Sequence, residues 1–474
     1  MQTMRNNRQY MAGMWRESAS VHEQKDVFRQ MPFSITHLSS PDDVETALQA
    51  AHVGASAMEA APAHQRASWL RLAADALAAR RDELAAMLVA ESGKPLMLCH
   101  SEIARSIETL RFSADEATRM AGSVLPMDAS ERGEGRFGFY VRVPMGVVAA
   151  ITPFNAPLNL LAHKVGPALA AGNAVIAKPD PRAASCATVL FEAFEEIGLP
   201  AGALNLVHGG REVGERLVND PRVNLISFTG SKQAAFNIVR QAGLKRVQFE
   251  LGGNAGNIVC EDADLDLAAN ELAVHAFGHA GQSCIGVQRI HVVDAVYPMF
   301  IKKFIDQVRA LKVGDPALPD TQVGPLIDEA TSERLAGWIR DAVNAGATLL
   351  TGGERDGAML TPAVLIDVDK RLPIVCEEVF GPIVTVERVA NLEAAIESVN
   401  DSVYGLQAGV FTRSIHAALD CVRQLKVGGV VINGTSNYRV DHQPYGGVKQ
   451  SGIGREGPAF AIEAMTELRM AVMQ

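Results

Sequence analysis

The sequence of 474 residues predicts an α/β fold, and both composition and pattern support this prediction. Hydrophobic residues make up 48% of the chain and charged residues 21%, which allows a large core and excludes global disorder. Aromatic residues are only 5%, so small aliphatic side chains are expected to pack helices against a sheet. Short apolar runs alternate with helical stretches, as in the βαβ units of a parallel sheet. We therefore expect two α/β domains and a separate β-ribbon.

The N-terminal part begins irregularly and then becomes helical. Weak periodicity over the first 40 residues indicates short strands or an irregular edge. From Pro62 to Leu88, apolar residues recur at steps of three and four, which predicts one helix. The Ser-Gly-Lys-Pro run at 92–95 ends this helix, because glycine favours a helix end and proline cannot continue it. A second helix is expected over 101–120.

Strands and helices alternate after Arg142. Before this point, residues 122–142 carry glycines among charged and aromatic side chains, which is typical of an exposed β-ribbon or a surface loop. Strands are expected at 146–151, 174–177, 204–207 and 223–228, and helices at 159–171, 185–197, 213–219 and after Ser231. A second alternating series runs from about 257 to 432. The tail from Asn433 is glycine-rich and is then expected to be helical.

Charge and cysteine usage exclude several classes of protein. Lys and Arg total 44 and Asp and Glu total 54, so the net charge is −10, and without a basic cluster no nucleic-acid binding is expected. No apolar stretch approaches the roughly 18 residues of a membrane span. Residues 1–16 are polar and lack the apolar core of a secretory signal. Six scattered cysteines without a CxxC motif fit a reducing compartment. A soluble, cytoplasmic protein is expected.

Two strand ends suit a phosphate-bearing ligand. The run Phe228-Thr229-Gly230-Ser231 ends a strand and opens a helix, whose free backbone N–H groups attract anions. A GxGxxG motif is absent, so a structural turn is the alternative. Lys178 follows another predicted strand, where ligands of parallel sheets gather, and a solvated charge is the alternative.

Cys284 and Glu250 are candidates for chemistry. Cys284 lies in a turn between Gly281 and Gly286, where a thiol can be exposed and polarised by amides. Glu250 ends an apolar strand beside two glycines, and a buried carboxylate is costly unless it is functional or paired in a salt bridge. No metal site is expected, since His275 and His279 share one helical spacing but lack the HEXXH glutamate and a third ligand.

Ordered motifs then identify a resemblance. They are Glu91-Ser92-Gly93-Lys94-Pro95, Thr152-Pro153-Phe154-Asn155, Lys178-Pro179, Phe228-Thr229-Gly230-Ser231, Glu250-Leu251-Gly252-Gly253, Gly281-Gln282-Ser283-Cys284, Glu377-Glu378-Val379-Phe380-Gly381-Pro382 and Pro444-Tyr445-Gly446-Gly447-Val448-Lys449. Together they resemble the aldehyde dehydrogenase superfamily from about Arg66 onward. The chain is most similar to the branch that oxidises lactaldehyde, succinate semialdehyde and phosphonoacetaldehyde.

The resemblance implies an architecture. A Rossmann-type cofactor-binding domain would comprise 1–122 and 143–251, and an α/β catalytic domain would comprise 252–438. Segments 123–142 and 439–474 would bridge subunits, because exposed strand edges in a ribbon require a partner. A homodimer or a homotetramer is therefore expected.

The resemblance also implies site roles. Cys284 would be the nucleophile, Glu250 the base that activates water, and Asn155 an amide donor to the oxyanion. The cofactor would be bound by Ile151, Thr152, Pro153, Phe154, Lys178, Asp180, Gly210, Gly214, Phe228, Thr229, Gly230, Ser231, Leu251, Gly252, Glu378 and Phe380.

The cofactor type depends on the residues after Lys178. Relatives specific for NAD often carry a glutamate three positions on, where this chain has Pro181. Asp180 would repel the 2′-phosphate of NADP if it faces the ribose. NAD is expected, with NADP left open.

The substrate side differs from that of relatives that use fatty or aromatic aldehydes. Ala156, Asn159, Ser283 and Arg439 occupy the lining positions, and Arg105 matches a further pocket position. Two guanidinium groups would suit an anionic substrate. The alternative is that Arg105 and Arg439 face solvent or pair with Glu102 or Asp441.

Three function classes remain. The first is hydrolytic, NAD(P)-dependent oxidation of a small anionic or hydroxylated aldehyde. The second is a CoA-acylating dehydrogenase, against which Glu250 argues, since relatives of that kind usually lack the base. The third is a non-catalytic binding protein on the same fold.

Overall fold

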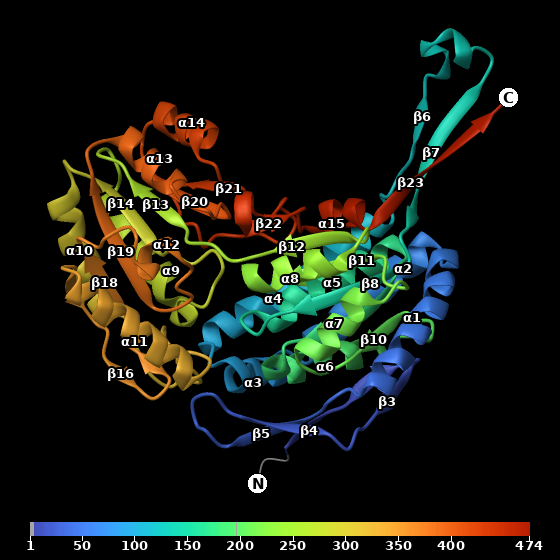
Figure 1. The fold of residues 1–474 in the computed structure, drawn as a ribbon, viewed down its shortest axis with the longest axis horizontal. Helices are drawn as coiled ribbons and strands as arrows, with labels where there is room; N and C mark the ends of the chain where they lie inside the picture. The colour runs from blue at the N-terminus through green and yellow to red at the C-terminus, as the bar shows by residue number, and fades with distance from the viewer. Residues whose placement is uncertain (1–3, 196) are drawn as a thin grey trace.

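The computed structural model describes residues 4–195 and 197–474 and confirms the α/β fold (Figure 1). Two large sheets dominate the chain. The first has the order β22-β12-β11-β8-β9-β10-β2-β3, and the second has the order β15-β18-β19-β14-β13-β20-β21. Both are mostly parallel, with antiparallel strands confined to edges. A third sheet forms a projecting arm.

The first sheet is built as predicted from short apolar strands. Its members are β2 (Gln9–Met11), β3 (Met14–Arg16), β8 (Val147–Thr152), β9 (Ala174–Pro179), β10 (Leu204–Leu206), β11 (Leu225–Thr229), β12 (Arg246–Glu250) and β22 (Gly452–Ile453). In β8, Val148 and Ala150 face one hydrophobic core, while Val147, Ala149 and Ile151 face another. Burial on both faces explains why these strands appear in the sequence as continuous apolar runs.

Helices cover both faces of this sheet. One core is shared with α2 (Ala63–Ala79), α3 (Arg81–Ser92), α4 (Leu96–Ala117), α5 (Pro157–Ala171) and α6 (Ala184–Glu195). The other is shared with α1 (Pro41–Ala60), α7 (Arg211–Asn219) and α8 (Lys232–Ala242). The parallel strands therefore end together at one edge, with helix N-termini beside them.

The second sheet repeats the pattern. Its strands are β13 (Gly256–Val259), β14 (Arg289–Val293), β15 (Thr348–Thr351), β18 (Ala363–Ile366), β19 (Ile383–Val389), β20 (Gln407–Phe411) and β21 (Gly429–Ile432). The helices of this part are α9 (Leu265–Phe277), α10 (Tyr297–Ala310), α11 (Glu329–Asn344), α12 (Pro373–Cys376), α13 (Leu392–Asn400) and α14 (Ile415–Gln424). Two small sheets lie apart from the two large ones. One is formed by β1 (Arg5–Asn7), β5 (Pro32–His37) and β4 (Val21–Lys25), and the other by β16 (Arg355–Asp356) and β17 (Met359–Leu360).

Two helix predictions near the N-terminus need correction. The single helix expected from Pro62 is two helices, because the chain breaks at Arg80, whose φ of −108° and ψ of 21° leave the helical region. Helix α1 was not predicted, since its alanines and glycine give a weak apolar stripe. It begins at a capping box in which Ser40 and Asp43 bond each other's backbone N–H.

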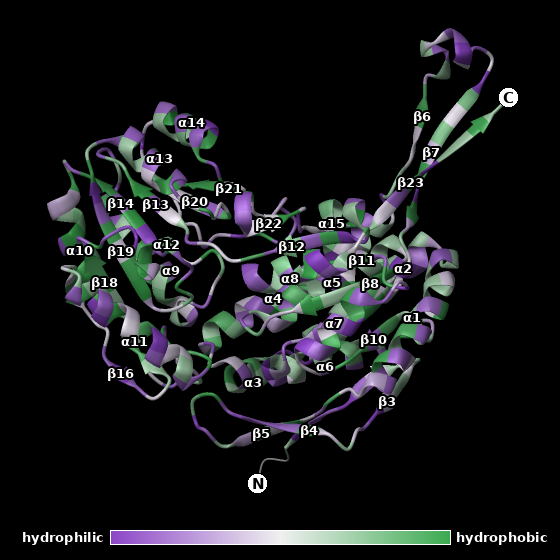
Figure 2. Ribbon diagram, in the orientation of Figure 1, coloured by the Kyte–Doolittle hydropathy of each residue, from purple (hydrophilic) through white to green (hydrophobic). Residues whose placement is uncertain are grey.

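The arm confirms the predicted ribbon and corrects the predicted tail. Strands β6 (Ser123–Leu125), β7 (Phe137–Pro144) and β23 (Thr466–Met473) pair antiparallel. The tail is helical only in α15 (Pro458–Ala464) and ends as β23. β23 is exposed on both faces and so lacks the alternation that marks a strand. Figure 2 shows hydrophobic residues along β7 and β23, and Phe137 and Leu468 are exposed there.

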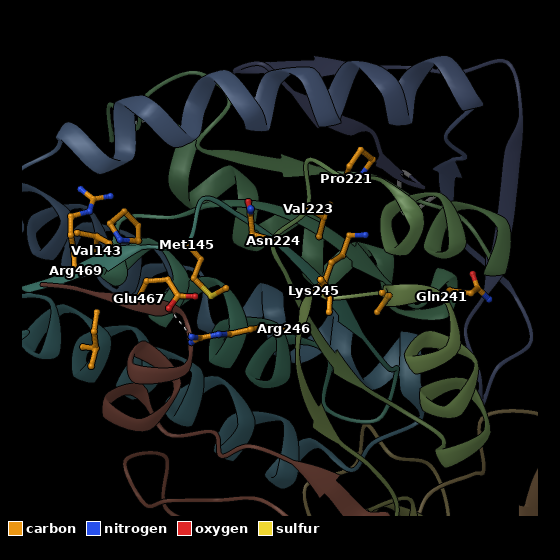
Figure 3. A pocket seen from close by; sticks show the side chains of 15 residues that line it. Val143, Met145, Pro221, Val223, Asn224, Gln241, Lys245, Arg246, Glu467 and Arg469 are labelled. Carbon is orange, nitrogen blue, oxygen red and sulfur yellow. Dashed lines mark hydrogen bonds and ion pairs between the residues drawn. The ribbon is translucent and has the colours of Figure 1, made fainter.

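A cavity of about 710 Å³ lies at the base of this arm (Figure 3). Met145, Lys245 and Leu244 contribute to its lining, and Arg246 bonds Glu467 at 2.7 Å. It is separate from the cavity that holds the predicted site.

Candidate active site

A cavity of about 750 Å³ opens where β8, β9, β11 and β12 end. Ligands of parallel sheets gather at such an edge. The register places Thr152 beside Pro179 and Thr229 beside Glu250 on neighbouring strands. The lining contains the three predicted catalytic residues and every predicted cofactor residue: Ile151, Thr152, Pro153, Phe154, Asn155, Lys178, Asp180, Gly210, Gly214, Phe228, Thr229, Gly230, Ser231, Glu250, Leu251, Gly252, Cys284, Glu378 and Phe380.

Cys284 follows a strained turn after α9. His279 and Ala280 both have positive φ values, 53° and 51°, and this turn directs the chain back toward the cavity. The Cys284 thiol lies 3.2 Å from the hydroxyl of Tyr445. Burial raises the pKa of the thiol to about 11, and the bond to Tyr445 acts in the opposite direction. The free chain therefore holds Cys284 mainly as a thiol at neutral pH.

Asn155 lies in the loop after β8, beside the turn that carries Cys284. Its amide Nδ2 donates to the backbone carbonyl of Gln282 at 3.0 Å, and the residue is buried. A side-chain amide has two N–H donors, so one remains for a ligand. The contact to Gln282 fixes the direction of the remaining N–H near Cys284.

Glu250 is a buried carboxylate without a hydrogen-bond partner on either oxygen. Burial, followed by the charge of Glu456, raises its pKa well above the ordinary value. A side-chain Cβ at Gly446 would come within 2.8 Å of Glu250 Oε1, so only glycine lets this segment pass so closely. An unpartnered carboxylate of this kind marks a functional group more often than a structural one.

A buried ion cluster lies behind Glu250. Lys164 Nζ and Arg439 Nη2 both bond the carboxylate of Glu456, at 3.1 and 3.0 Å. Burial alone would raise the pKa of Glu456, but Lys164 and Arg439 outweigh it and lower the pKa to about 2. Glu456 is therefore charged, and its charge favours the protonated form of Glu250.

The residues at the ends of β8, β9 and β11, together with Gly252 and Glu378, fit a dinucleotide. Lys178 is buried and donates to the Gly209 carbonyl at 2.8 Å, and burial lowers its pKa. Thr152 and Thr229 have buried hydroxyls without a partner. A Cβ at Gly252 would lie 2.0 Å from Glu378 Oε2, so the glycine leaves room for this carboxylate. Burial raises the pKa of Glu378 to about 7. Ser231 caps α8 and leaves the first N–H groups of that helix free for an anion.

Asp180 is engaged by a residue that the sequence did not single out. Arg182 bonds both carboxylate oxygens of Asp180 at 3.0 Å and lies over the Phe154 ring, 4.4 Å from its centroid. Burial would raise the pKa of Asp180, but Arg182 lowers it. Arg182 also lines the cavity.

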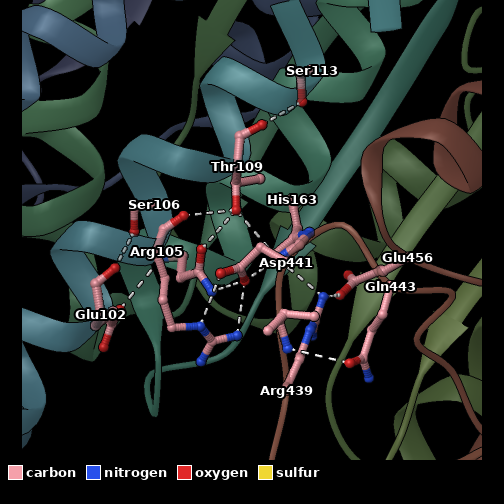
Figure 4. A network of polar contacts seen from close by, with 12 residues as sticks. Glu102, Arg105, Ser106, Thr109, Ser113, His163, Arg439, Asp441, Gln443 and Glu456 are labelled. Carbon is pink, nitrogen blue, oxygen red and sulfur yellow. Dashed lines mark hydrogen bonds and ion pairs between the residues drawn. The ribbon is translucent and has the colours of Figure 1, made fainter. Parts of the chain in front are cut away.

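The four predicted substrate residues lie outside the lining of this cavity. Arg105, Asn159 and Arg439 belong to a polar network, in which Figure 4 labels Arg105, Arg439 and Asp441. Arg105 Nε and Nη2 bond Asp441 at 3.0 and 2.8 Å, which is the alternative stated above for this residue. Asn159 Nδ2 also donates to Asp441, at 3.0 Å. Ser283 Oγ donates to Asn437 at 3.0 Å.

Arg439 is buried and carries a different set of partners. Its Nη2 contacts Glu456 and His163, and its guanidinium lies 3.8 Å from the ring centroid of Tyr445. Its Nε is buried without a partner. Arg439 therefore pairs with Glu456 and not with Glu102 or Asp441, the partners named in the alternative above.

Sequence reasoning missed several residues of the site. Tyr445 belongs to a quoted motif but received no role, and His163 and Lys164 were not considered. A signal was present: these two polar side chains interrupt the apolar run of α5, and every residue of that helix is buried. Buried charges require partners, so the pair predicts an internal network.

Two further features were sought in the described part of the chain, a cluster of metal ligands and a membrane-spanning helix. Within residues 4–195 and 197–474, no three His, Cys, Asp or Glu residues gather as a metal site. Across the same described ranges, no helix combines the length and apolar character that crossing a membrane requires.

Comparisons with known proteins agree with the resemblance. Residues 15–471 match the model of the aldehyde dehydrogenase family. The 3-sulfolactaldehyde dehydrogenase of Priestia aryabhattai is 43% identical over 469 residues, covering 98% of this chain and 97% of that protein. A lactaldehyde dehydrogenase of Methanococcus maripaludis is 35% identical over 475 residues, covering 98% and 99%.

Solved structures are similar over the whole fold. Aldehyde dehydrogenase 21 from Physcomitrella patens, in complex with succinate, has a TM-score of 0.97 at 35% identity, covering 100% of this chain and 99% of that one. An NADP complex of glyceraldehyde-3-phosphate dehydrogenase from Bacillus halodurans has a TM-score of 0.96 at 34% identity, covering 99% of both. An NAD+ complex of betaine aldehyde dehydrogenase from Staphylococcus aureus has a TM-score of 0.95 at 31% identity, covering 98% and 94%. With this site and these similarities, the chain belongs to the aldehyde dehydrogenase family and is an oxidoreductase that oxidises aldehydes with NAD or NADP.

Proposed function

We propose that this enzyme oxidises a small aldehyde bearing an anionic or hydroxyl group to its carboxylic acid by covalent catalysis at Cys284. The observation that carries the mechanism is the convergence of Cys284, Glu250 and Asn155 on one cavity with the cofactor residues. A nucleophile, a base and an oxyanion donor are the parts that acyl chemistry through a thioester requires.

The residues act in sequence. The Cys284 thiol first loses its proton to solvent, because the unliganded site holds it mainly protonated. The thiolate then adds to the aldehyde carbon, and the oxyanion accepts a hydrogen bond from Asn155 Nδ2. A fixed donor of this kind stabilises such an oxyanion by about 3 kcal/mol. NAD or NADP, when held by the residues around Lys178, Ser231 and Glu378, would supply the hydride acceptor for the oxidation. Glu250, deprotonated, then removes a proton from water as it attacks the Cys284 thioester, which releases the acid.

The unpartnered Glu250 supports hydrolysis over transfer to CoA. A CoA thiol is itself the acyl acceptor and requires no water-activating base at this position. Neither carboxylate oxygen of Glu250 contributes a hydrogen bond to the fold, so a structural role has little support. The same argument disfavours a non-catalytic binding protein. Burying the Glu250 carboxylate without a partner costs free energy, and a protein without catalytic activity would have no use for it.

The polar network supports a small polar substrate. Asn159, Ser283, Arg105 and Arg439 lie outside the cavity lining, at positions where the resemblance places apolar lining in relatives for long aldehydes. Such lining would favour a long alkyl chain by about 25 cal/mol per Å² of buried area. Arg439 Nε is buried without a partner and can take an anionic oxygen. The similarity to a sulfolactaldehyde enzyme and to lactaldehyde enzymes fits this class.

For the cofactor we propose NAD over NADP by a modest margin. Asp180 is ionised and lies at the cavity, where it would repel a 2′-phosphate, and Pro181 offers no carboxylate to the ribose. The adjacent Arg182 offsets part of this repulsion.

For the assembly we propose a homodimer or a tetramer of dimers. The exposed Phe137, Val141, Leu468 and Met470 of the arm are apolar surface that a second subunit would cover. Light scattering at micromolar concentration should give a multiple of the 50.6 kDa chain mass, and a monomer would contradict the proposal.

A substrate panel tests the proposed function. We expect kcat/KM with NAD to be highest for a short sulfonated or hydroxylated aldehyde or for succinate semialdehyde. Hexanal and benzaldehyde should be at least tenfold poorer, which corresponds to about 1.4 kcal/mol. If either of these two is the best substrate, the proposed class is wrong.

A further inference from the structure

The hydroxyl of Tyr445 faces the nucleophile. It lies 3.2 Å from Cys284 Sγ, and Tyr445 is only 3% exposed, packed with Ile285 and Leu406. We propose that Tyr445 is a positioning residue whose hydroxyl holds Cys284 Sγ toward the cavity and donates a hydrogen bond to the thiolate. The proposal rests on the role of Cys284 in the proposed function.

Tyr445 is itself held from two sides. Its backbone N–H donates to the Glu456 carbonyl at 3.1 Å, and the Glu456 N–H donates back at 2.6 Å. The guanidinium of Arg439 lies over its ring, at a distance typical of a cation–π contact. Arg439 is anchored in turn by Glu456 and His163. The hydroxyl is therefore directed at Sγ before any substrate binds.

The charge state of the pair makes the direction of the hydrogen bond certain once the thiol ionises. Burial and the nearby Cys284 charge raise the pKa of Tyr445 well above its ordinary value, so the phenol stays protonated. A thiolate has no proton to give, and Tyr445 must then be the donor. Hydrogen bonds to charged acceptors are stronger than neutral ones, so the contact favours the thiolate over the thiol.

A purely structural role for Tyr445 makes a different prediction. If the ring only fills space, phenylalanine should serve equally well, because it retains the packing and the contact with Arg439. The ionisation of Cys284 separates the two cases, and it can be measured by alkylation with iodoacetamide without any aldehyde or cofactor.

The experiment measures the rate of Cys284 alkylation between pH 6 and 11.5, followed by peptide mass spectrometry. Cys376 is the exposed cysteine among the described residues, so all variants carry Cys376→Ala. Tyr297→Phe is the matched control, since Tyr297 also lies under an arginine, Arg388, but outside the cavity. A variant with 3-fluorotyrosine at 445 supplies a stronger donor of nearly the same shape.

We expect Tyr445→Phe to raise the apparent pKa of alkylation by about 1 and to slow alkylation at pH 8 roughly tenfold, the effect of losing one hydrogen bond to a charged group. The fluorotyrosine variant should lower this pKa below that of wild type, and Tyr297→Phe should leave it unchanged. Thermal unfolding should show that each variant is folded.

An unchanged alkylation profile in both Tyr445 variants would overturn the inference. If Tyr445→Phe does not fold, the fluorotyrosine variant alone tests the inference. If the Tyr445 ring only fills space, a stronger hydrogen-bond donor at this position should not change the pKa of Cys284 alkylation. If Tyr445→Phe shifts the pH profile of Cys284 alkylation but the wild-type enzyme oxidises none of the tested aldehydes, the proposed substrate class is wrong and the positioning role of Tyr445 is retained. If the wild-type enzyme oxidises these aldehydes but the alkylation profile does not shift in the Tyr445 variants, the proposed function is retained and the positioning role is wrong.

Discussion

The cofactor side and the substrate side of Cys284 differ in what positions their residues. On the cofactor side, every residue expected to bind the dinucleotide lines the cavity. On the substrate side, Arg105, Asn159, Ser283 and Arg439 all lie outside that lining and bond other protein groups. Sequence motifs therefore predict the position of a residue well where the backbone fixes it. They predict it poorly where a long side chain can bond any of several partners.

The backbone explains why the residues expected to bind the cofactor meet at one cavity. Neighbouring parallel strands place Ile151 beside Lys178 and Thr229 beside Glu250, so the ends of four strands meet without help from side chains. By contrast, Arg105 reaches Asp441 across 336 positions of sequence, and nothing in local pattern reveals that pairing.

Replacing Cys284 with alanine should have the largest effect. Oxidation should fall by at least roughly 10³-fold, because no other group can form the covalent intermediate. The cofactor side should be unaffected, so the dissociation constant of NAD, measured by protein fluorescence, should stay within about twofold. Substantial turnover by a folded Cys284→Ala protein would refute covalent catalysis, and Cys376→Ala serves as the cysteine control.

Glu250→Gln should produce the next largest effect. The acylation step survives, so mixing should give a burst of one equivalent of reduced cofactor followed by turnover slowed by roughly 10²- to 10³-fold. Because burial raises the pKa of Glu250, the wild-type deacylation rate should increase with pH above the ordinary carboxyl range, as the base form accumulates. Steady-state turnover equal to wild type would show that another base acts.

The sequence predicts the secondary structure where a segment's own pattern is sufficient, and fails where an element depends on a distant partner, as it does for the site. Buried strands such as β8 and β9 were found because burial on both faces leaves continuous apolar runs. Helix α1 was missed because its buried face is built from small residues, and β23 because it is exposed on both faces and defined by its pairing with β7. Elements that depend on a distant partner carry little local signal.

Removing the arginines tests the substrate side directly. Arg439→Ala should lower kcat/KM for a sulfonated aldehyde or succinate semialdehyde by about 10- to 100-fold, since a charged hydrogen bond is worth about 1.5 to 3 kcal/mol. Arg105→Ala should have a smaller effect, because the Arg105 guanidinium already bonds Asp441. Hexanal should change less. Arg111→Ala is the matched control, because Arg111 lies on the same helix and pairs with Asp75 at the surface. Unchanged use of the anionic substrates by both variants would show that these arginines serve only the internal network.

The smallest expected effect concerns the cofactor. If Asp180 disfavours the 2′-phosphate, wild type should prefer NAD by less than tenfold, and Asp180→Asn should shift the NADP-to-NAD ratio of kcat/KM toward NADP by about fivefold, or about 1 kcal/mol. The charge of Arg182 would then face the phosphate without its partner. Asp220→Asn is a matched control, because Asp220 bonds Arg222 in the same Asp-Pro-Arg arrangement outside this cavity. A tenfold preference of the wild type for NADP would reverse this interpretation, and it would mean that Arg182, rather than Asp180, sets the cofactor.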